Sequence, residues 1–215
     1  LVVDNLAKSF GVKTIFKNVS FMIDKGEKIG LVGVNGSGKS TLLHCLLQNG
    51  YSDSGSVRFE AGTRVGYVEQ GFGNIGSGSL WQFMMNSCPE IPGMRSRLQK
   101  LEAQAADLKP GEELDKVLDE YASVTRRYEY IDGYNYETRI KIVLNGLGFT
   151  EDVWDKPAQN FSGGQKTRIL LAAALVKSPD FLILDEPTNT LDSRMTEWPD
   201  KYLQDFKGCL LMVSH

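Results

Sequence analysis

Apolar residues along the chain gather in short runs, and turn residues bound most of these runs. The runs predict strands at residues 19–23, 28–32, 181–185 and 209–214, and a short antiparallel pair from residues 57–59 and 64–68. The two later runs, FLILD and CLLMVS, are apolar almost throughout. Strands of that kind belong to a parallel sheet covered on both faces, so the pattern indicates an α/β fold.

Helical spacing of apolar residues marks several of the segments between these strands. The spacing is found at residues 42–47, 98–108, 114–128 and 136–147, and further helices are expected from Ser162 and near residues 197–206. Pro110 and Gly111 separate the second stripe from the third, and two amphipathic helices joined by a Pro-Gly turn predict a helical hairpin. Gly148 supplies a stop for the fourth stripe.

Composition and charge narrow the class of protein. The 215 residues are 41% hydrophobic and 24% charged, which suits one globular domain, or one domain with an insertion. The formal net charge of -3 means that the chain as a whole lacks the excess of positive charge typical of nucleic-acid-binding proteins. The longest apolar run is far too short for a membrane span. Three scattered cysteines without metal-ligand spacing favour reduced thiols in a cytosolic protein. The first residue is not methionine and the sequence stops abruptly at His215, so we expect a fragment of a longer chain.

The segment GVNGSGKST, residues 33–41, follows one of the expected strands and opens an expected helix. It supplies Gly33, Asn35, Gly36, Ser37, Gly38, Lys39, Ser40 and Thr41 to a candidate phosphate-binding loop. Glycines let backbone amides surround phosphate oxygens, and the positive end of the following helix points to the same place. In such a loop Lys39 contacts the β and γ phosphates, Ser40 a magnesium ion, and Thr41 the α phosphate. A flexible glycine turn is the alternative, and the flanking strand and helix disfavour it.

An acidic pair ends the apolar strand at residues 181–185. The end of a parallel strand places a carboxylate at the same sheet edge as the phosphate-binding loop, so Asp185 is a candidate magnesium ligand. Glu186 is the candidate general base, which orients an attacking water. A capping acidic pair without chemistry is the structural alternative, and the phosphate-binding loop upstream makes it the weaker interpretation.

A second glycine motif, FSGGQ at residues 161–165, opens a later helix. Ser162 and Gln165 have the spacing of a capping box, which is a sufficient structural reason for those two residues. Gly163 and Gly164 bare the first amides of the helix and make a second anion site. One nucleotide does not need two phosphate-binding helices in one subunit. We therefore expect this helix to serve a nucleotide that another subunit or domain holds.

The order and spacing of these segments resemble the nucleotide-binding domain of an ABC ATPase over essentially the whole chain. The resemblance implies a P-loop NTPase of the α/β class, with a mostly parallel core sheet, an antiparallel β subdomain and an inserted α-helical subdomain. ATP and Mg²⁺ are the implied ligands. The resemblance also implies roles for single residues: Phe10 stacks on adenine, Gln70 senses magnesium and water, Ser162 to Gln165 close over ATP bound in trans, Asp192 is the D-loop acid, and His215 contacts the γ phosphate.

Within this family the chain is similar to the ABC-F branch. The similarity lies in DEPTNTLD at residues 185–192, in EWPDKYLQDFKG from residue 197, and in YNYETRIKIVLNGLGF at residues 134–149. The helical hairpin, expected at about residues 94–130, corresponds to the arm insertion of ABC-F proteins. We expect an ATPase core from residues 1–70 and 155–215, and a helical subdomain from residues 71–154.

The ABC-F resemblance implies a cytoplasmic ATPase with two ABC domains in one chain, of which this is the first, acting on the ribosome. The hairpin carries more acidic than basic residues, although contact with ribosomal RNA favours Lys and Arg. Two other functions stay open. One is the ATP-binding subunit of a membrane transporter, without membrane insertion of its own. The other is a regulatory module that binds ATP without turnover, and the presence of Glu186 and His215, the expected catalytic residues, argues against it.

Overall fold

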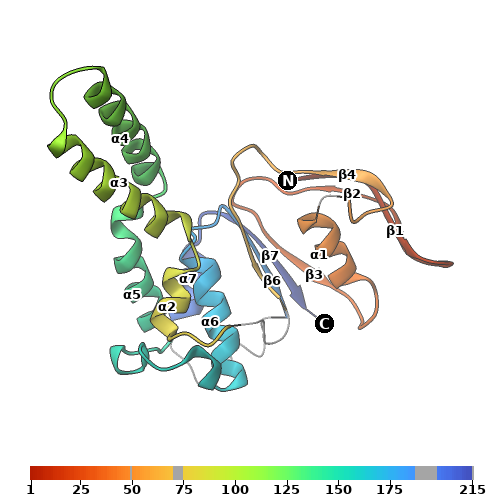
Figure 1. Cartoon of the computed structure of the whole chain (residues 1–215). Coiled ribbons are helices and arrows are strands. Elements are labelled where there is room, and N and C mark those ends of the chain that lie inside the picture. The colour runs from red at the N-terminus through yellow and green to blue at the C-terminus, as the bar shows by residue number, and fades with distance from the viewer. Residues whose placement is uncertain (49, 70–74, 187–197, 215) are drawn as a thin grey trace. The chain divides into compact units, whose positions relative to one another are not determined.

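The computed structural model describes residues 1–48, 50–69, 75–186 and 198–214. Contacts within the chain divide it into two compact units. The first unit combines Leu1–Asn74 with Ser162–His215, and the second unit is Ile75–Phe161. Figure 1 labels their elements.

The first unit contains a four-stranded parallel sheet. Its strands, in spatial order, are β3 (Lys28–Val32), β7 (Cys209–Ser214), β6 (Phe181–Asp185) and β5 (Val65–Val68). β6 is buried along its whole length, as its apolar sequence predicts (Figure 1). Because parallel strands end at one edge of a sheet, the segments that follow β3 and β6 come to the same edge.

A second, antiparallel sheet of the same unit has the order β2 (Lys13–Met22), β1 (Val2–Phe10) and β4 (Ser54–Arg58). The prediction that residues 57–59 and 64–68 pair with each other is wrong. β4 pairs with β1, and β5 pairs in parallel with β6. The apolar VGYV segment of β5 gains burial in the core sheet, and burial against tertiary neighbours outweighs closeness in sequence.

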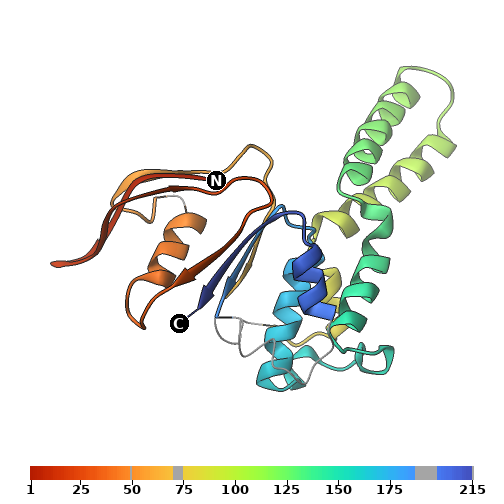
Figure 2. The same cartoon turned by 180° about the vertical axis from the view of Figure 1, so that it is seen from behind.

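Helix α1 (Lys39–Leu47) lies between the two sheets of the first unit (Figure 2). Its fully buried Leu43 belongs to one apolar core with Leu6 of β1 and Ile183 of β6. Helices α6 (Gly163–Leu175) and α7 (Trp198–Asp205) lie on the other side of the parallel sheet (Figures 1 and 2). The core sheet is therefore covered on both faces, which confirms the expected α/β class.

The second unit is helical and contains the expected hairpin. Its helices are α2 (Leu80–Met85), α3 (Glu90–Asp107), α4 (Glu112–Tyr130) and α5 (Tyr136–Gly146). α3 and α4 pack against each other and are joined at Pro110 and Gly111, as the sequence predicts (Figure 1). The exposed Arg97 of α3 donates two hydrogen bonds to Glu120 of α4, from Nε to Oε1 and from Nη2 to Oε2, both at 2.7 Å. This pair links the two helices. Among the helices described here, none has the length and apolar character that crossing a membrane requires.

Gly55 in β4 allows a close approach of two strands, and its replacement gives a stability prediction. Its φ is +86°, and a Cβ at this position would lie 2.5 Å from the carbonyl oxygens of Asp4 and Asn5. We expect Gly55→Ala to lower the free energy of unfolding by about 2–4 kcal/mol, from backbone strain and overpacking together. Denaturant unfolding measures the change.

Gly62→Ala is the matched control for this prediction. Gly62 has almost the same φ, +82°, but nothing lies within 4 Å of its added Cβ. Only backbone strain then applies, so we expect a loss of about 1–2 kcal/mol. Equal losses in the two variants would contradict the steric argument.

Candidate functional site

The loop between β3 and α1 has the backbone geometry that a phosphate-binding loop needs. Gly36 and Gly38 adopt positive φ values of 79° and 97°, and Gly38 is the N-cap of α1. A Cβ on Gly38 would lie 2.5 Å from Cγ2 of Ile15 in β2, and one on Gly33 would lie 2.9 Å from Oγ of Ser37. At Gly38, glycine is thus required by packing as well as by backbone conformation, whereas a Cβ on Gly33 would meet only the side chain of Ser37.

Lys39 begins α1, and its side chain turns back into the loop. Its Nζ donates to the carbonyl oxygen of Gly33 at 2.7 Å and to that of Val34 at 3.2 Å. The ammonium group and the first amides of the helix therefore face one small region. Asn35, Ser37 and Ser40 are exposed, and Thr41 is half-buried. This combination of cation, amides and helix start fits the phosphates of a nucleotide.

Asp185 is the one charged residue that is buried in the described part of the chain, at 6% exposure. The hydroxyl of Ser40 donates to its Oδ2 at 3.5 Å, so two of the three residues expected to hold magnesium lie together. Burial raises the pKa of the Asp185 carboxyl and the charge of Glu186 adds to the rise, whereas Ser40, Lys39 and His44 oppose it. A carboxylate and a hydroxyl oxygen side by side fit a hard divalent cation, whose charge would favour the ionised acid.

Glu186 has a strained backbone. Its φ is +50°, in the left-handed region that an L-residue with a side chain rarely adopts. Its N–H donates to the carbonyl oxygen of Val213 in β7 at 3.0 Å, so the core sheet holds this conformation. Strain of about 1–3 kcal/mol at one residue is typical of sites where a side chain must point in a fixed direction.

The start of α6 carries the expected capping box. The N–H of Ser162 donates to Oε1 of Gln165 at 2.9 Å, and the Gln165 N–H donates back to the Ser162 hydroxyl at 3.4 Å. Helix α2 has the same reciprocal cap from Ser79 and Gln82, but with Leu80 and Trp81 between them. Capping alone therefore does not require glycines.

Gly164 is exposed, and nothing lies within 4 Å of a Cβ added to it. Its own unit thus gives no packing reason for a glycine at that position. Among the hydrogen bonds of the described residues, none joins residues 162–165 to the loop at residues 33–41.

Phe10 ends β1 and is 50% exposed. Its ring packs edge-on against the Tyr51 ring, with the ring centroids 6.5 Å apart. The Tyr51 ring in turn packs against the imidazole of His44 in α1, with the ring centroids 5.7 Å apart. Lys8 lies over both the Phe10 and the Tyr51 rings. The sequence analysis missed three residues of this cluster: Lys8, His44 and Tyr51. No sequence pattern marks them, because they lie in β1, in α1 and in the segment before β4, and only the fold brings their side chains together.

Three of the expected site residues, Gln70, Asp192 and His215, lie outside the residues that the structure describes. The loop and Asp185 are brought together through Ser40, and the hairpin that carries Phe10 packs against the loop through Ile15. The structure therefore brings Asp185 and the hairpin that carries Phe10 against the phosphate-binding loop.

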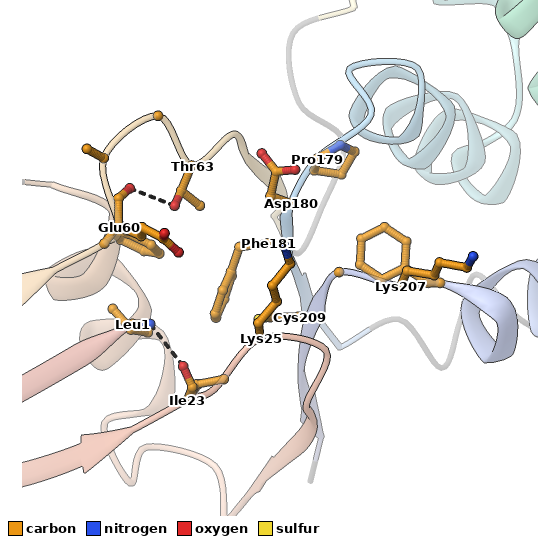
Figure 3. Close-up of a pocket in the computed structure, with 15 residues that line it drawn as sticks. Leu1, Ile23, Lys25, Glu60, Thr63, Pro179, Asp180, Phe181, Lys207 and Cys209 are labelled. Atoms are coloured by element: carbon orange, nitrogen blue, oxygen red, sulfur yellow. Dashed lines mark hydrogen bonds between the residues drawn. The ribbon is translucent and has the colours of Figure 1, made fainter.

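A cavity of about 410 Å³ lies elsewhere in the first unit, at the amino ends of β6 and β7 (Figure 3). Phe181 and Cys209 line it, together with Glu60 and Thr63 on one side and Lys207 on the other. The phosphate-binding loop follows the carboxyl end of β3, at the other edge of the sheet. Of the expected site residues that the structure describes, none lines this cavity.

Comparison with known proteins finds relatives that match the whole length of this chain. The pattern of the family described as ABC transporter matches residues 16–189. The chain is 34% identical over 215 residues to the tylosin resistance ATP-binding protein TlrC of Streptomyces fradiae, and 30% identical over 201 residues to the energy-dependent translational throttle protein EttA of Haemophilus influenzae. All of this chain takes part in the first match, and 94% of it in the second. Both relatives are of the ABC-F type.

The matched region is only part of each relative. The chain spans 39% of the length of TlrC and 35% of that of EttA. Among solved structures, CbiO1 of Clostridium perfringens, part of the ABC transporter complex CbiONQ, aligns over 100% of this chain and 77% of its own. The TM-score is 0.62 at 24% identity, which confirms the fold and nothing further.

Proposed function

This chain belongs to the ABC transporter family as an ABC ATPase domain, and on that premise we propose that it binds Mg·ATP and hydrolyses it to ADP and phosphate. The observation that carries the proposal is the contact of Ser40 with the buried Asp185 beside the loop that Lys39 enters. The glycines, the cation and the carboxylate serve one ligand with three phosphates and a divalent ion. A structural turn would account for the glycines, but it needs neither the lysine ammonium in the loop nor the buried carboxylate beside it.

Each residue has a separate task in the proposed reaction. Lys39 and the amides of residues 33–41 hold the phosphates, and Phe10 stacks on the base. Ser40 and Asp185, with Gln70, would hold Mg²⁺, which when bound neutralises charge on the phosphate oxygens. Glu186 orients the attacking water, and its left-handed backbone fixes where the carboxylate points.

We further propose that a second ABC domain completes the site. The glycines at the start of α6 support this step, since α2 forms the same cap without them. Gly163 and Gly164 would let the amides of α6 approach the γ phosphate of ATP held by the other domain. Asp192 and His215 would act at the same boundary. Closure of the two domains would then depend on contacts made only with the triphosphate.

The whole protein, we propose, is an ABC-F translation factor that acts on ribosomes in the cytoplasm. The ABC-F type of the relatives supports this, as does the name of EttA, a translational throttle protein. The hairpin of α3 and α4 is the element expected to contact the ribosome. The alternative is the ATP-binding subunit of a membrane transporter, which the family description and the fold of CbiO1 both allow.

Co-sedimentation with ribosomes tests the proposal. We expect the full-length Glu186→Gln variant to pellet with ribosomes in ATP and much less in ADP, because the closed state would form but not reopen. Wild-type protein in ATP should pellet less than the variant. Equal pelleting of the variant with and without ATP would contradict the ribosomal role. Recovery of a stable integral membrane partner from a detergent extract would favour the transporter subunit instead.

A further inference from the structure

Lys8 of β1 occupies an unusual position for a lysine at the protein surface. Its side chain is only 13% exposed, and its Nζ lies 5.4 Å from the centroid of the Phe10 ring and 4.6 Å from that of Tyr51. The same Nζ donates to Oδ1 of Asp53 at 2.9 Å. A mostly buried ammonium group between two aromatic rings and one carboxylate has very little freedom to move.

Asp53 also holds the backbone beside Phe10. Its Oδ2 accepts a hydrogen bond from the N–H of Ser9 at 2.6 Å, while its own N–H donates to the carbonyl oxygen of Ala7 at 2.9 Å. Hydrogen bonds from Lys8 and Ser9 lower the pKa of the Asp53 carboxyl, so it stays ionised at neutral pH. One carboxylate thus fixes both the Lys8 side chain and the Lys8–Ser9 peptide, one residue before Phe10.

We propose that Lys8 and Asp53 are positioning residues that hold the Phe10 ring ready to stack on the nucleotide base. The inference rests on the proposed ATP site, and it adds the two residues that set the orientation of the ring. Phe10 ends its strand next to Gly11, whose φ is +57°, so an unsupported ring at this turn would sample many orientations. Fixing the ring before the ligand arrives lowers the entropy cost of binding.

The same cluster is tied to the phosphate-binding elements. Tyr51, under Lys8, contacts His44 in the last turn of α1, and α1 begins with Lys39. Ile15, in the strand that follows Phe10, sits against Gly38 of the loop. The ring and the loop therefore belong to one packed unit, and a ring held by Lys8 is also held at a fixed distance from the phosphates.

Binding of two probes separates base recognition from phosphate recognition. In the full-length protein we expect Lys8→Met to raise the dissociation constant of Mg·ATP about tenfold, a typical loss for one base–aromatic stack, and to leave that of Mg·tripolyphosphate unchanged. Asp53→Asn should act in the same direction, and Lys8→Arg should restore most of the affinity. In steady-state hydrolysis, KM should rise with kcat unchanged, because stacking is the same in the ground state and the transition state.

Lys17→Met on the exposed part of β2 is the matched control, and it should bind both probes like wild type. ATP affinity of Lys8→Met equal to that of wild type would overturn the positioning role while leaving the proposed ATP site intact. Equal weakening of ATP and tripolyphosphate would show that Lys8 only supports the fold, and would also overturn it. Wild-type protein that binds neither probe would instead overturn the proposed function.

Discussion

Glu186→Gln is expected to lower the rate of ATP hydrolysis by about two to four orders of magnitude while ATP binding stays within a factor of two of wild type. The amide keeps the size of the side chain and its hydrogen-bonding reach, but it cannot accept a proton from the attacking water. Phosphate release under saturating ATP measures the rate, and equilibrium binding of ATP measures the affinity. Full activity of the variant would show that the general base has been assigned wrongly.

Two further variants make this experiment specific. Glu60→Gln makes the same chemical change at the cavity by the amino ends of β6 and β7, and it should leave hydrolysis unchanged (Figure 3). Glu186→Gly removes the carboxylate and also the left-handed strain at φ +50°. It should hydrolyse as slowly as Glu186→Gln yet lose no stability, and could gain up to about 1 kcal/mol, because relief of strain offsets the entropy cost of glycine. A Glu186→Gly variant that is more stable than wild type but hydrolyses ATP slowly would show that the backbone strain at Glu186 is retained for function.

The sequence was most informative where a local backbone rule and a chemical requirement coincide. The loop at residues 33–41 needs glycines at positive φ directly before a helix, and both the glycines and the helix start can be recognised in consecutive residues of the sequence. The strand at residues 181–185 was predicted with its observed bounds because a strand buried on both faces shows a continuous apolar run. The capping box at Ser162 and the helical hairpin around Pro110 and Gly111 were predictable for the same reason.

Pairing between distant segments could not be predicted in the same way. Residues 57–59 and 64–68 are neighbours in sequence, yet they join different sheets, because the choice depends on which buried surface each strand completes. The support of Phe10 shows the same limit. Lys8 comes from β1, whereas Tyr51 and Asp53 come from the segment before β4, and each is an ordinary residue for its own segment. Only the folded chain brings an ion pair and two rings to one point.

Gly164→Asp is expected to reduce hydrolysis about a hundredfold or more without harming the fold of this chain. A Cβ on Gly164 meets nothing within 4 Å, so the isolated unit accommodates the new side chain. An acidic residue in the first turn of a helix also interacts favourably with the helix dipole. A triphosphate that approaches these amides from a second domain would, in contrast, meet a carboxylate, and repulsion between the two anions would prevent closure.

Gly93→Asp in α3 is the matched control for that variant, since an added Cβ at this helical glycine also has nothing within 4 Å. Both variants should unfold at or above the wild-type temperature and bind ATP normally in their own loop, so thermal unfolding and ATP binding exclude a damaged fold. Hydrolysis by full-length protein should fall in Gly164→Asp alone. If Gly164→Asp hydrolyses ATP at the wild-type rate, the open glycines of α6 do not face a nucleotide, and the proposed completion of the site by a second domain is wrong. If it loses activity while its fold and its own ATP binding are intact, the lost contact is one with a nucleotide held by another ABC domain, because the ATP site of the first unit still binds its ligand.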